Sequence, residues 1–255
     1  MSQIHEYARL FHSLHVPGKP LVLFNVWDAG SARAVADAGA AAIATGSWSV
    51  AAAHGHADGE QLPFDLALGN LRRIADAVAL PVSVDLESGY GETPAAVAAC
   101  VAAAIAAGAI GCNLEDSHPA SGELRDIAGQ VARLRAAREA ADAAGVAWFL
   151  NARTDVFFQH PADAHAPALV DAALERARAY ADAGASGLFV PGLAAEALIG
   201  SLVERSPLPV NIMARAGGPG RARLAELGVA RISHGPGPYR GAMAWLQEAA
   251  RAAMA

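Results

Sequence analysis

Cysteine and long apolar runs are the features that this sequence most clearly lacks. Its 255 residues contain two cysteines, so a disulfide framework is excluded and a reducing, cytoplasmic compartment is expected. No apolar run without charges reaches the roughly 18 residues that a transmembrane helix requires. The segment from Met1 to Tyr7 has neither the basic region nor the apolar region of a signal peptide. We therefore expect a soluble cytoplasmic protein without a membrane partner.

Positive charge is also scarce in this chain. Lysine and arginine together number 19, against 25 aspartate and glutamate residues, which gives a formal net charge of −6. Such a balance provides no basic surface for nucleic acid and no polybasic anchor for a membrane. A small molecule is the expected partner.

What the chain does contain is a regular alternation of short apolar runs and longer, alanine-rich helical patterns. Strands are predicted near residues 21–27, 41–46, 81–86, 109–115, 147–153, 186–191, 208–213 and 230–234. Helices are predicted near residues 3–15, 31–39, 64–79, 93–107, 124–144, 165–183, 194–205, 219–227 and 239–254. This order predicts one α/β domain over residues 1–255, a (β/α)8 TIM barrel with an extra N-terminal helix.

Two segments interrupt the alternation after predicted strands. Residues 47–62 contain glycines and histidines and follow the second strand, whereas residues 117–124 follow the fourth. Barrel enzymes carry their active sites at the carboxyl ends of the strands, so both segments are expected to be loops that border the site.

Acidic residues stand at the end of the predicted third strand. Because strand side chains alternate, Val84 and Leu86 are expected on one face and Asp85 and Glu87 on the other. Two adjacent acids would be costly in an ordinary core. This pattern favours a site for a hard metal ion.

Other predicted strand ends add ligands and a cation to this acidic pair. Carboxylate oxygens suit Mg²⁺, with Mn²⁺ as an alternative, and the candidate metal ligands are Asp85, Glu87 and Glu115. Arg153 offers a bidentate fork for a substrate carboxylate, although an ion pair with Asp155 or Glu115 is an alternative role. Asn211 and His234 end later strands and are candidate substrate contacts. A divalent ion facing an arginine is a receptor for a 2-oxo acid.

Several motifs together resemble the isocitrate lyase and phosphoenolpyruvate mutase superfamily over nearly the whole chain. They are Asp85-x-Glu87-x-Gly89-Tyr90-Gly91, Asn113-Leu-Glu-Asp116, Ala152-Arg-Thr-Asp155 and Gly46-Ser-Trp-Ser49 followed by Asp58. The resemblance implies a Mg²⁺-dependent enzyme that makes or breaks a C–C or P–C bond beside a pyruvyl unit through an enolate. It implies Asp85 as the main metal ligand, with a water-linked shell formed by Asp58, Glu87 and Glu115. It also implies that the 2-oxo carboxylate is held by Arg153 and by the backbone of Gly46, Ser47 and Trp48.

The chain departs from the resembling family in the loop after Asp116. The Lys-Lys/Arg-Cys-Gly-His motif of the lyases is replaced by Ser117-His-Pro-Ala-Ser-Gly-Glu-Leu124, and the Lys and Asn of the mutases are missing too. His118 in this loop is a candidate substitute acid or base, or else a solvated side chain. Pro191-Gly192 stands where the lyases have Pro-Glu. The special groups of both branches are thus absent, while the shared metal and carboxylate site is kept.

We therefore predict a lyase or decarboxylase that cleaves a C–C bond of a 2-oxo or 2-hydroxy di- or tricarboxylic acid, with an oxaloacetate-like substrate favoured. The alternatives are a 2-methylisocitrate or isocitrate-type lyase, a phosphonopyruvate P–C bond enzyme and a non-catalytic 2-oxo-acid-binding protein. The resemblance further implies that the amphipathic eighth helix, residues 239–254, is exchanged between subunits of a homodimer or homotetramer. A helix packed on its own barrel is the alternative.

Overall fold

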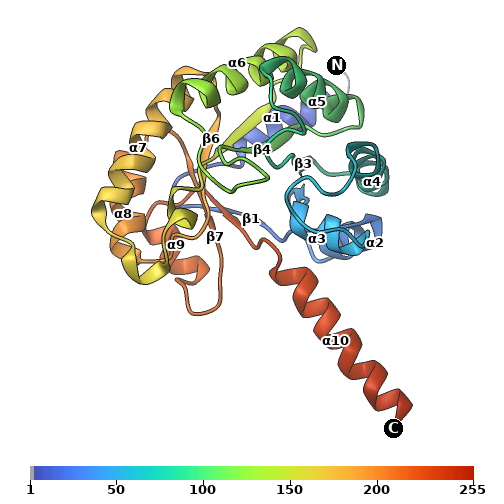
Figure 1. The fold of residues 1–255 in the computed structure, drawn as a ribbon. Helices are drawn as coiled ribbons and strands as arrows, with labels where there is room; N and C mark the ends of the chain where they lie inside the picture. The colour runs from blue at the N-terminus through green and yellow to red at the C-terminus, as the bar shows by residue number, and fades with distance from the viewer. Residues whose placement is uncertain (1–2) are drawn as a thin grey trace.

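The computed structural model describes residues 3–255 and shows a barrel of parallel strands surrounded by helices (Figure 1). Met1 and Ser2, part of the segment considered for a targeting signal, lie outside the described residues. The eight strands of the described chain are hydrogen-bonded in the order β1-β8-β7-β6-β5-β4-β3-β2. A parallel bridge between Val26 and Thr45 links the two ends of this sheet and nearly closes it. The predicted (β/α)8 barrel is confirmed.

The strands are shorter than the apolar runs that predicted them, because each run continues into the loops beyond the hydrogen-bonded ladder. Their bounds are Leu21–Leu23 (β1), Ile43–Ala44 (β2), Val82–Asp85 (β3), Gly111–Glu115 (β4), Phe149–Arg153 (β5), Gly187–Val190 (β6), Val210–Met213 (β7) and Arg231–Ser233 (β8). The carboxyl ends of all these strands face the same end of the barrel, where the polar strand-end residues gather.

The helices follow the predicted order with small shifts at their ends. The bounds are Gln3–Ser13 (α1), Ala29–Asp37 (α2), Ser47–Ala53 (α3), Phe64–Ala77 (α4), Pro94–Ala106 (α5), Ile127–Ala143 (α6), Pro167–Asp182 (α7), Glu196–Arg205 (α8), Arg221–Glu226 (α9) and Gly237–Met254 (α10). Two short 3-10 helices, Val156–Gln159 (η1) and Ala162–Ala164 (η2), follow β5. Helix α2 begins earlier than predicted, because Asp28 caps it by accepting a hydrogen bond from the Ser31 amide at 2.7 Å.

The segment predicted as a loop after β2 is helical in its first half. Helix α3 covers Ser47–Ala53, and its residues Val50 and Ala51 are buried together with Leu62 in a small apolar cluster. This burial explains the helix, because short helices are stabilised mainly by tertiary packing. The remaining residues up to Leu62 form the loop that carries Asp58.

The barrel interior is polar below its mouth. Asn113 Oδ1 accepts hydrogen bonds from Asn151 Nδ2 at 2.9 Å and from Arg231 Nη2 at 3.1 Å. Asn151 Nδ2 also donates to Asn211 Oδ1 at 3.2 Å, and Asn211 donates to Ser233 Oγ at 3.2 Å. These side chains are all buried. A connected polar network of this kind holds neighbouring strand ends in a fixed relation.

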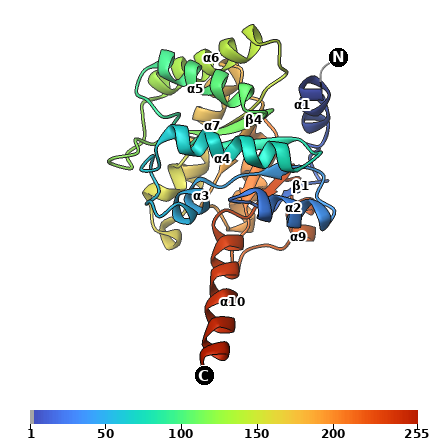
Figure 2. The same ribbon diagram turned by 90° about the vertical axis from the view of Figure 1, so that its right-hand side faces the viewer.

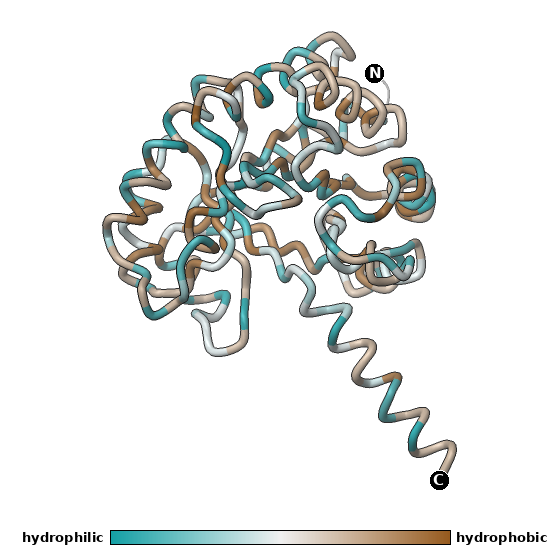
Figure 3. Tube along the Cα trace, viewed as in Figure 1, coloured by the Kyte–Doolittle hydropathy of each residue, from teal (hydrophilic) through white to brown (hydrophobic). Residues whose placement is uncertain are grey.

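Helix α10 extends away from the barrel in both ribbon views (Figures 1 and 2). None of its residues, all of which are described, is buried, and Trp245 is 71% exposed. Polar and apolar residues alternate along it (Figure 3). No helix within residues 3–255 is long and apolar enough to cross a membrane.

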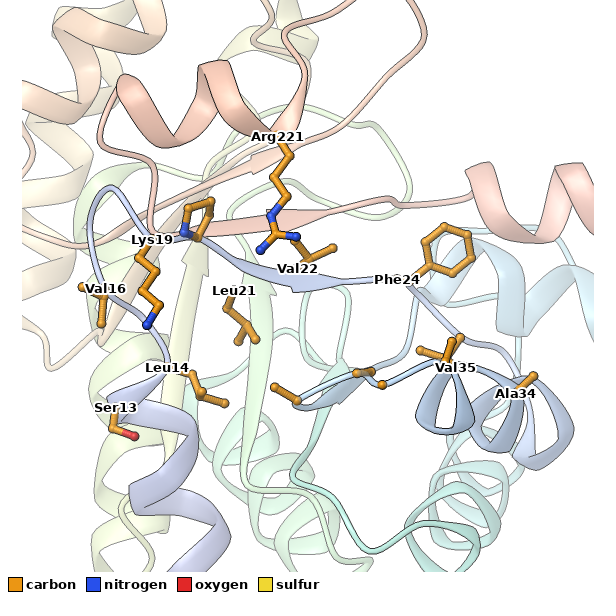
Figure 4. Close-up of a pocket in the computed structure, with 15 residues that line it drawn as sticks. Ser13, Leu14, Val16, Lys19, Leu21, Val22, Phe24, Ala34, Val35 and Arg221 are labelled. Atoms are coloured by element: carbon orange, nitrogen blue, oxygen red, sulfur yellow. The ribbon is translucent and has the colours of Figure 1, made fainter.

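A groove of about 740 Å³ lies beside β1, and no residue of α10 lines it. It runs between the end of α1, β1, α2 and the start of α9, and Figure 4 shows Leu14, Val22, Val35 and Arg221 along it. Its lining is largely apolar, with Lys19 and Arg221 as cationic members.

Protonation of His15 is expected to make folding stability depend on pH. The His15 side chain is 8% exposed and is stacked on the ring of Phe149, with the two ring centroids 3.8 Å apart. The first strand of the barrel follows it in the sequence. Burial, together with repulsion from Arg231, lowers the pKa of His15 to about 3. As the pH is lowered, His15 is therefore protonated near pH 6.5 in the unfolded chain but only near pH 3 in the folded chain.

We predict that His15→Phe, which cannot be protonated, flattens the loss of stability between these pH values. The stability that neutral His15 contributes is full above pH 6.5 and falls as pH is lowered towards 3, by at most about 1.4 kcal/mol per pH unit. Urea unfolding at several pH values measures the difference between variant and unchanged protein. The exposed His160→Phe is the control, and equal slopes for all three proteins would contradict the prediction.

Candidate active site

A pocket of about 190 Å³ opens at the carboxyl ends of the strands. The structure brings six predicted residues to its wall, namely Gly46, Ser47, Trp48, Asp58, Asp85 and Arg153. They come from the β2–α3 connection, the start of α3, the loop after α3, β3 and β5. The pocket therefore lies where the sequence placed the site, although five other candidates, Glu87, Glu115, His118, Asn211 and His234, do not line it.

Asp85, the last residue of β3, uses its two carboxylate oxygens differently. Oδ2 accepts hydrogen bonds from the Ser47 amide at 3.1 Å and the Ser47 hydroxyl at 2.9 Å. Oδ1 is buried and accepts no hydrogen bond from any described residue. A buried carboxylate oxygen without a donor is costly unless a cation or water occupies the space beside it.

The donor set around Asp85 fits magnesium bound mainly through water. No group of three or more His, Cys, Asp or Glu side chains within residues 3–255 is arranged to hold a metal ion. Mg²⁺ commonly takes one or two carboxylates and completes its coordination with water and substrate oxygens. Asp85 supplies the open oxygen for such a site, and Asp58 lies exposed on the wall of the same pocket.

The prediction that Glu87 shares a strand face with Asp85 is wrong. β3 ends at Asp85, and Glu87 has a left-handed backbone with φ 51°, so alternation no longer applies. Its Oε2 instead accepts hydrogen bonds from the amides of Gly59 at 2.9 Å and Glu60 at 2.6 Å, and Tyr90 donates to Oε1 at 3.0 Å. Burial raises the pKa of Glu87 to about 7. Through these hydrogen bonds, Glu87 connects the end of β3 with the loop that carries Asp58.

Backbone strain is concentrated at this junction. The non-glycine residues with positive φ among the described residues are Glu60, Glu87 and Tyr90. Glu60 Oε1 accepts hydrogen bonds from the Ser88 hydroxyl at 2.7 Å and the Tyr90 amide at 2.9 Å. Strained residues persist where their surroundings over-determine them, which is common beside functional sites. Sequence reasoning missed Glu60, because no motif marked it.

Arg153, the last residue of β5, is held by two carboxylates. The register places Glu115 of β4 directly beside it, and Arg153 Nη1 lies 2.6 Å from Glu115 Oε2. On its other side, Nε and Nη2 donate to Asp155 at 2.6 and 3.0 Å. Although burial alone lowers it, these carboxylates raise the pKa of Arg153 above its usual value. Arg153 therefore forms ion pairs with both Asp155 and Glu115, the two partners that the sequence offered as alternatives.

This clamp still leaves Arg153 able to bind a ligand. A guanidinium has five N–H donors, and the three contacts above leave two without a partner among the described residues. The Ser117 hydroxyl donates to Asp155 and fixes that carboxylate in turn. An oriented guanidinium with two spare donors is a receptor for a carboxylate.

Asp116, beside Glu115 in sequence, is fully buried and anchors the loops below the pocket. It accepts hydrogen bonds from the Asp155 amide at 2.9 Å, Tyr180 at 2.8 Å and Arg176 at 3.0 Å. The two acids of the Glu-Asp motif thus have different roles. Glu115 orients Arg153, whereas Asp116 ties the ends of β4 and β5 to helix α7.

Three predicted candidates lie away from the pocket. Asn211 belongs to the buried polar network beneath it. His234 packs against Phe24 with ring centroids 5.0 Å apart, and its Nδ1 lies 3.3 Å from the Leu23 carbonyl. His118 Nδ1 lies 3.8 Å from Glu92 and does not line the pocket. The strand-end position of a residue does not fix where its side chain points.

Sequence reasoning also missed the apolar side of the pocket, formed by Phe158, Phe189, Pro191 and Met213. Phe189 and Met213 occupy the ends of β6 and β7, so a search of strand ends for apolar residues would have found them. Phe158 lies on η1, which no sequence pattern indicated.

Comparisons with known proteins show the relatives of this chain. The profile of the family described as phosphoenolpyruvate phosphomutase matches residues 11–254. A 2-methylisocitrate lyase of Escherichia coli is 32% identical over 218 residues, covering 78% of this chain and 70% of the lyase. A crystal structure from Burkholderia cenocepacia, provisionally described as a phosphonomutase, has 60% identity and a TM-score of 0.96 over 98% of this chain and 99% of that one. The structure of a 2,3-dimethylmalate lyase has 25% identity and a TM-score of 0.84, covering 98% and 87%.

We predict that Asp155→Asn destabilises the protein by about 2–4 kcal/mol, because it leaves the largely buried Arg153 with one counter-charge fewer. Urea unfolding measures the change. The exposed ion pair between Arg205 and Asp171 provides the matched control, and Asp171→Asn is expected to cost no more than about 0.5 kcal/mol. Similar losses in the two variants would contradict the importance assigned to the clamp.

Proposed function

The chain belongs to the phosphoenolpyruvate phosphomutase family of the isocitrate lyase superfamily, and from this premise we propose that it is a Mg²⁺-dependent carbon–carbon lyase acting on a 2-oxo acid. One observation carries the proposal. Asp85, whose buried Oδ1 has no hydrogen-bond partner among the described residues, and Arg153, which keeps two N–H donors for a ligand, both line a pocket of about 190 Å³. A 2-oxo acid presents a carboxylate to such an arginine and a keto oxygen to a cation.

The residues of the pocket divide into those that bind and those that orient. Arg153 and the amide of Trp48 hold the 2-oxo carboxylate, because the amides of Gly46 and Ser47 already donate to the Val26 carbonyl and to Asp85 Oδ2. Asp85 would be the direct ligand of Mg²⁺, with Asp58 as the other acid on the pocket wall, whereas Glu87 and Glu115 hold the Asp58 loop and Arg153 in place. When bound, the metal ion supplies positive charge to the enolate oxygen that develops as the carbon–carbon bond breaks. Ser47 fixes the rotamer of Asp85 by donating to its Oδ2.

Carbon–carbon cleavage fits the loop chemistry better than P–C chemistry. Residues 117–124 contain neither Lys nor Cys, so the groups that assist the specialised reactions of the resembling lyases and mutases are missing. Decarboxylation or retro-aldol cleavage asks least of those groups, because stabilisation of the enolate lowers most of the barrier. Oxaloacetate is therefore the first compound to test, followed by 2-methylisocitrate, isocitrate and phosphonopyruvate.

We further propose that the active protein is a homodimer or homotetramer in which α10 of one copy covers the groove beside β1 of another. Helix α10 exposes Trp245 and Leu246, and the groove of about 740 Å³ is lined by apolar side chains. Burying an exposed aromatic side chain in an apolar groove is favourable by about 2 kcal/mol or more.

We predict Mg²⁺-dependent turnover of at least one of these acids, with loss of about 10²-fold or more in kcat/KM for Asp85→Ala. Pyruvate, glyoxylate or succinate is followed with Mg²⁺ and with a chelator. Asp65→Ala, an exposed carboxylate on α4, is the control and keeps its activity. Turnover that persists in the presence of the chelator or in the Asp85→Ala variant would contradict the proposed mechanism. A melting temperature raised by 2-oxo acids only with Mg²⁺, without turnover, would instead indicate a binding protein.

We predict that Trp245→Asp lowers the oligomeric state, because a carboxylate cannot replace the indole in an apolar groove. Val22→Asp, on the groove side, is expected to have the same effect. Light scattering after gel filtration gives the mass of each protein. Glu248→Ala, exposed on the same helix, is the control. An unchanged mass for both aspartate variants would rule out this interface.

A further inference from the structure

Arg231, the first residue of β8, places a cation inside the barrel. Its side chain is 1% exposed. Nη2 donates to Asn113 Oδ1 at 3.1 Å, whereas Nε and Nη1 have no hydrogen-bond partner among the described residues. Burial lowers the pKa of Arg231 to about 10, so the guanidinium stays protonated at neutral pH. A buried cation whose partner is a neutral amide is costly to folding, so its position requires an explanation.

The side-chain amide of Asn113 can adopt only one orientation. Arginine nitrogens can only donate, so the atom that faces Arg231 is the amide oxygen of Asn113. Asn151 Nδ2 donates to the same oxygen at 2.9 Å. Asn151 is itself oriented by Asn211, whose Nδ2 donates to two backbone carbonyls and whose Oδ1 is left to accept from Asn151. The orientation of Asn113 is thus fixed by two independent donors.

This orientation presents the nitrogen of Asn113 to the candidate active site. Asn113 is buried, yet it lines the pocket of about 190 Å³. Its Nδ2 donates to no residue of the described chain, and it is not enclosed as Nε and Nη1 of Arg231 are. An amide N–H that reaches a cavity is a donor for an oxygen atom of a ligand. Trp48 Nε1 and the Ser233 hydroxyl on the same wall are further donors, available to other oxygen atoms.

Strand register places Asn113 beside the acid proposed to bind the metal ion. Asp85 of β3 pairs with Asn113 of β4, and both side chains line the pocket. In the proposed function, a cation at Asp85 takes the keto oxygen of a 2-oxo acid. The keto oxygen is therefore the atom of the substrate that is expected closest to the Asn113 amide.

Building on the proposed 2-oxo-acid function, we propose that Asn113 is a substrate-binding residue whose Nδ2 donates to the 2-oxo oxygen, and that Arg231 is its positioning residue. Arg231 fixes the amide from beneath the pocket and adds positive potential behind it. The 2-oxo oxygen gains negative charge as an enolate forms, so this pair favours the enolate over the bound 2-oxo acid.

Binding of pyruvate and of oxalate to the full-length protein with Mg²⁺ tests the proposal without turnover. Pyruvate carries the 2-oxo group, and oxalate is a planar dianion that resembles the enolate of pyruvate. Titration calorimetry gives the Kd of each compound. Infrared spectroscopy of bound pyruvate, isotope-labelled at the 2-oxo carbon, reports the stretching frequency of its C=O bond, which a hydrogen bond lowers.

Asn113→Asp keeps the shape of the side chain, removes the donor and gives Arg231 a counter-charge. We expect an unchanged or higher melting temperature, a Kd for oxalate raised about tenfold or more, and a higher C=O frequency for bound pyruvate. Gln3→Glu, exposed on α1, makes the same chemical change away from the site and is expected to alter none of these values. An unchanged C=O frequency would overturn the hydrogen bond, because a weaker Kd alone would then reflect repulsion by the new charge.

Arg231→Met tests the buried cation while Asn113 is kept. An apolar side chain of similar length is expected to fold at least as stably, because no ion pair of Arg231 is broken. We expect the Kd for oxalate to rise about threefold or more, and by a larger factor than the Kd for pyruvate, because oxalate carries two charges. Arg231→Lys restores the affinity, and the exposed Arg135→Met on α6 is the control. An oxalate Kd that Arg231→Met leaves unchanged would overturn the role of Arg231.

Failure of this proposal is distinguishable from failure of the lyase function. If both probes bind with the expected variant effects but none of the candidate acids is turned over, the roles of Asn113 and Arg231 stand and the lyase function is contradicted. If neither probe binds to the unchanged protein with Mg²⁺, both proposals are overturned.

Discussion

The ion pairs of Arg153 are the constraint on which the candidate site depends. A guanidinium at the mouth of the barrel would be mobile and solvated by itself, but Glu115 and Asp155 hold it on two sides. Asp155 is fixed in turn by Ser117 and by the amide contact to Asp116, and Asp116 is tied to Tyr180 of α7. Through these contacts one charge links the ends of two strands, the loop between β4 and α6, and a helix. A site that is preorganised in this way binds an anion without the free-energy cost of rearranging its own groups.

The three acids grouped by the sequence have different tasks in the structure. Asp85 keeps a buried oxygen without a hydrogen-bond partner in the described chain, Glu115 neutralises Arg153, and Glu87 accepts hydrogen bonds from backbone amides of the loop that carries Asp58. The loop and the metal side of the pocket are thereby coupled through Glu87, whose burial raises its pKa to about 7. The aromatic residues of the pocket lie beside its cation, because the guanidinium carbon of Arg153 is 5.7 Å from the ring centroid of Phe158 and 5.9 Å from that of Phe189.

The fold and the location of the site followed from the amino-acid sequence. Alternation of apolar runs and helical patterns predicted the barrel, and topology then required Asp85 and Arg153 to meet at one mouth, because all parallel strands end there. The loop motifs predicted the contribution of Gly46, Ser47, Trp48 and Asp58 to the same pocket. The positions of Asp85 and Arg153 are consequences of strand order and strand-end position, which a periodic pattern encodes, whereas Gly46, Ser47, Trp48 and Asp58 were expected from the resemblance of their motifs to the family.

Side-chain direction and register were decided by tertiary structure. Glu87 turns towards the Asp58 loop because β3 stops at Asp85 and the backbone becomes left-handed, and alternation cannot report where a strand stops. His234 and Asn211 also end strands, yet they face Phe24 and the buried network. The Glu115–Arg153 pair follows from the register between β4 and β5, which the sequence does not specify. Phe158 enters the wall because Gly192, 34 positions later, leaves space for it, and such contacts exist only once the chain has folded.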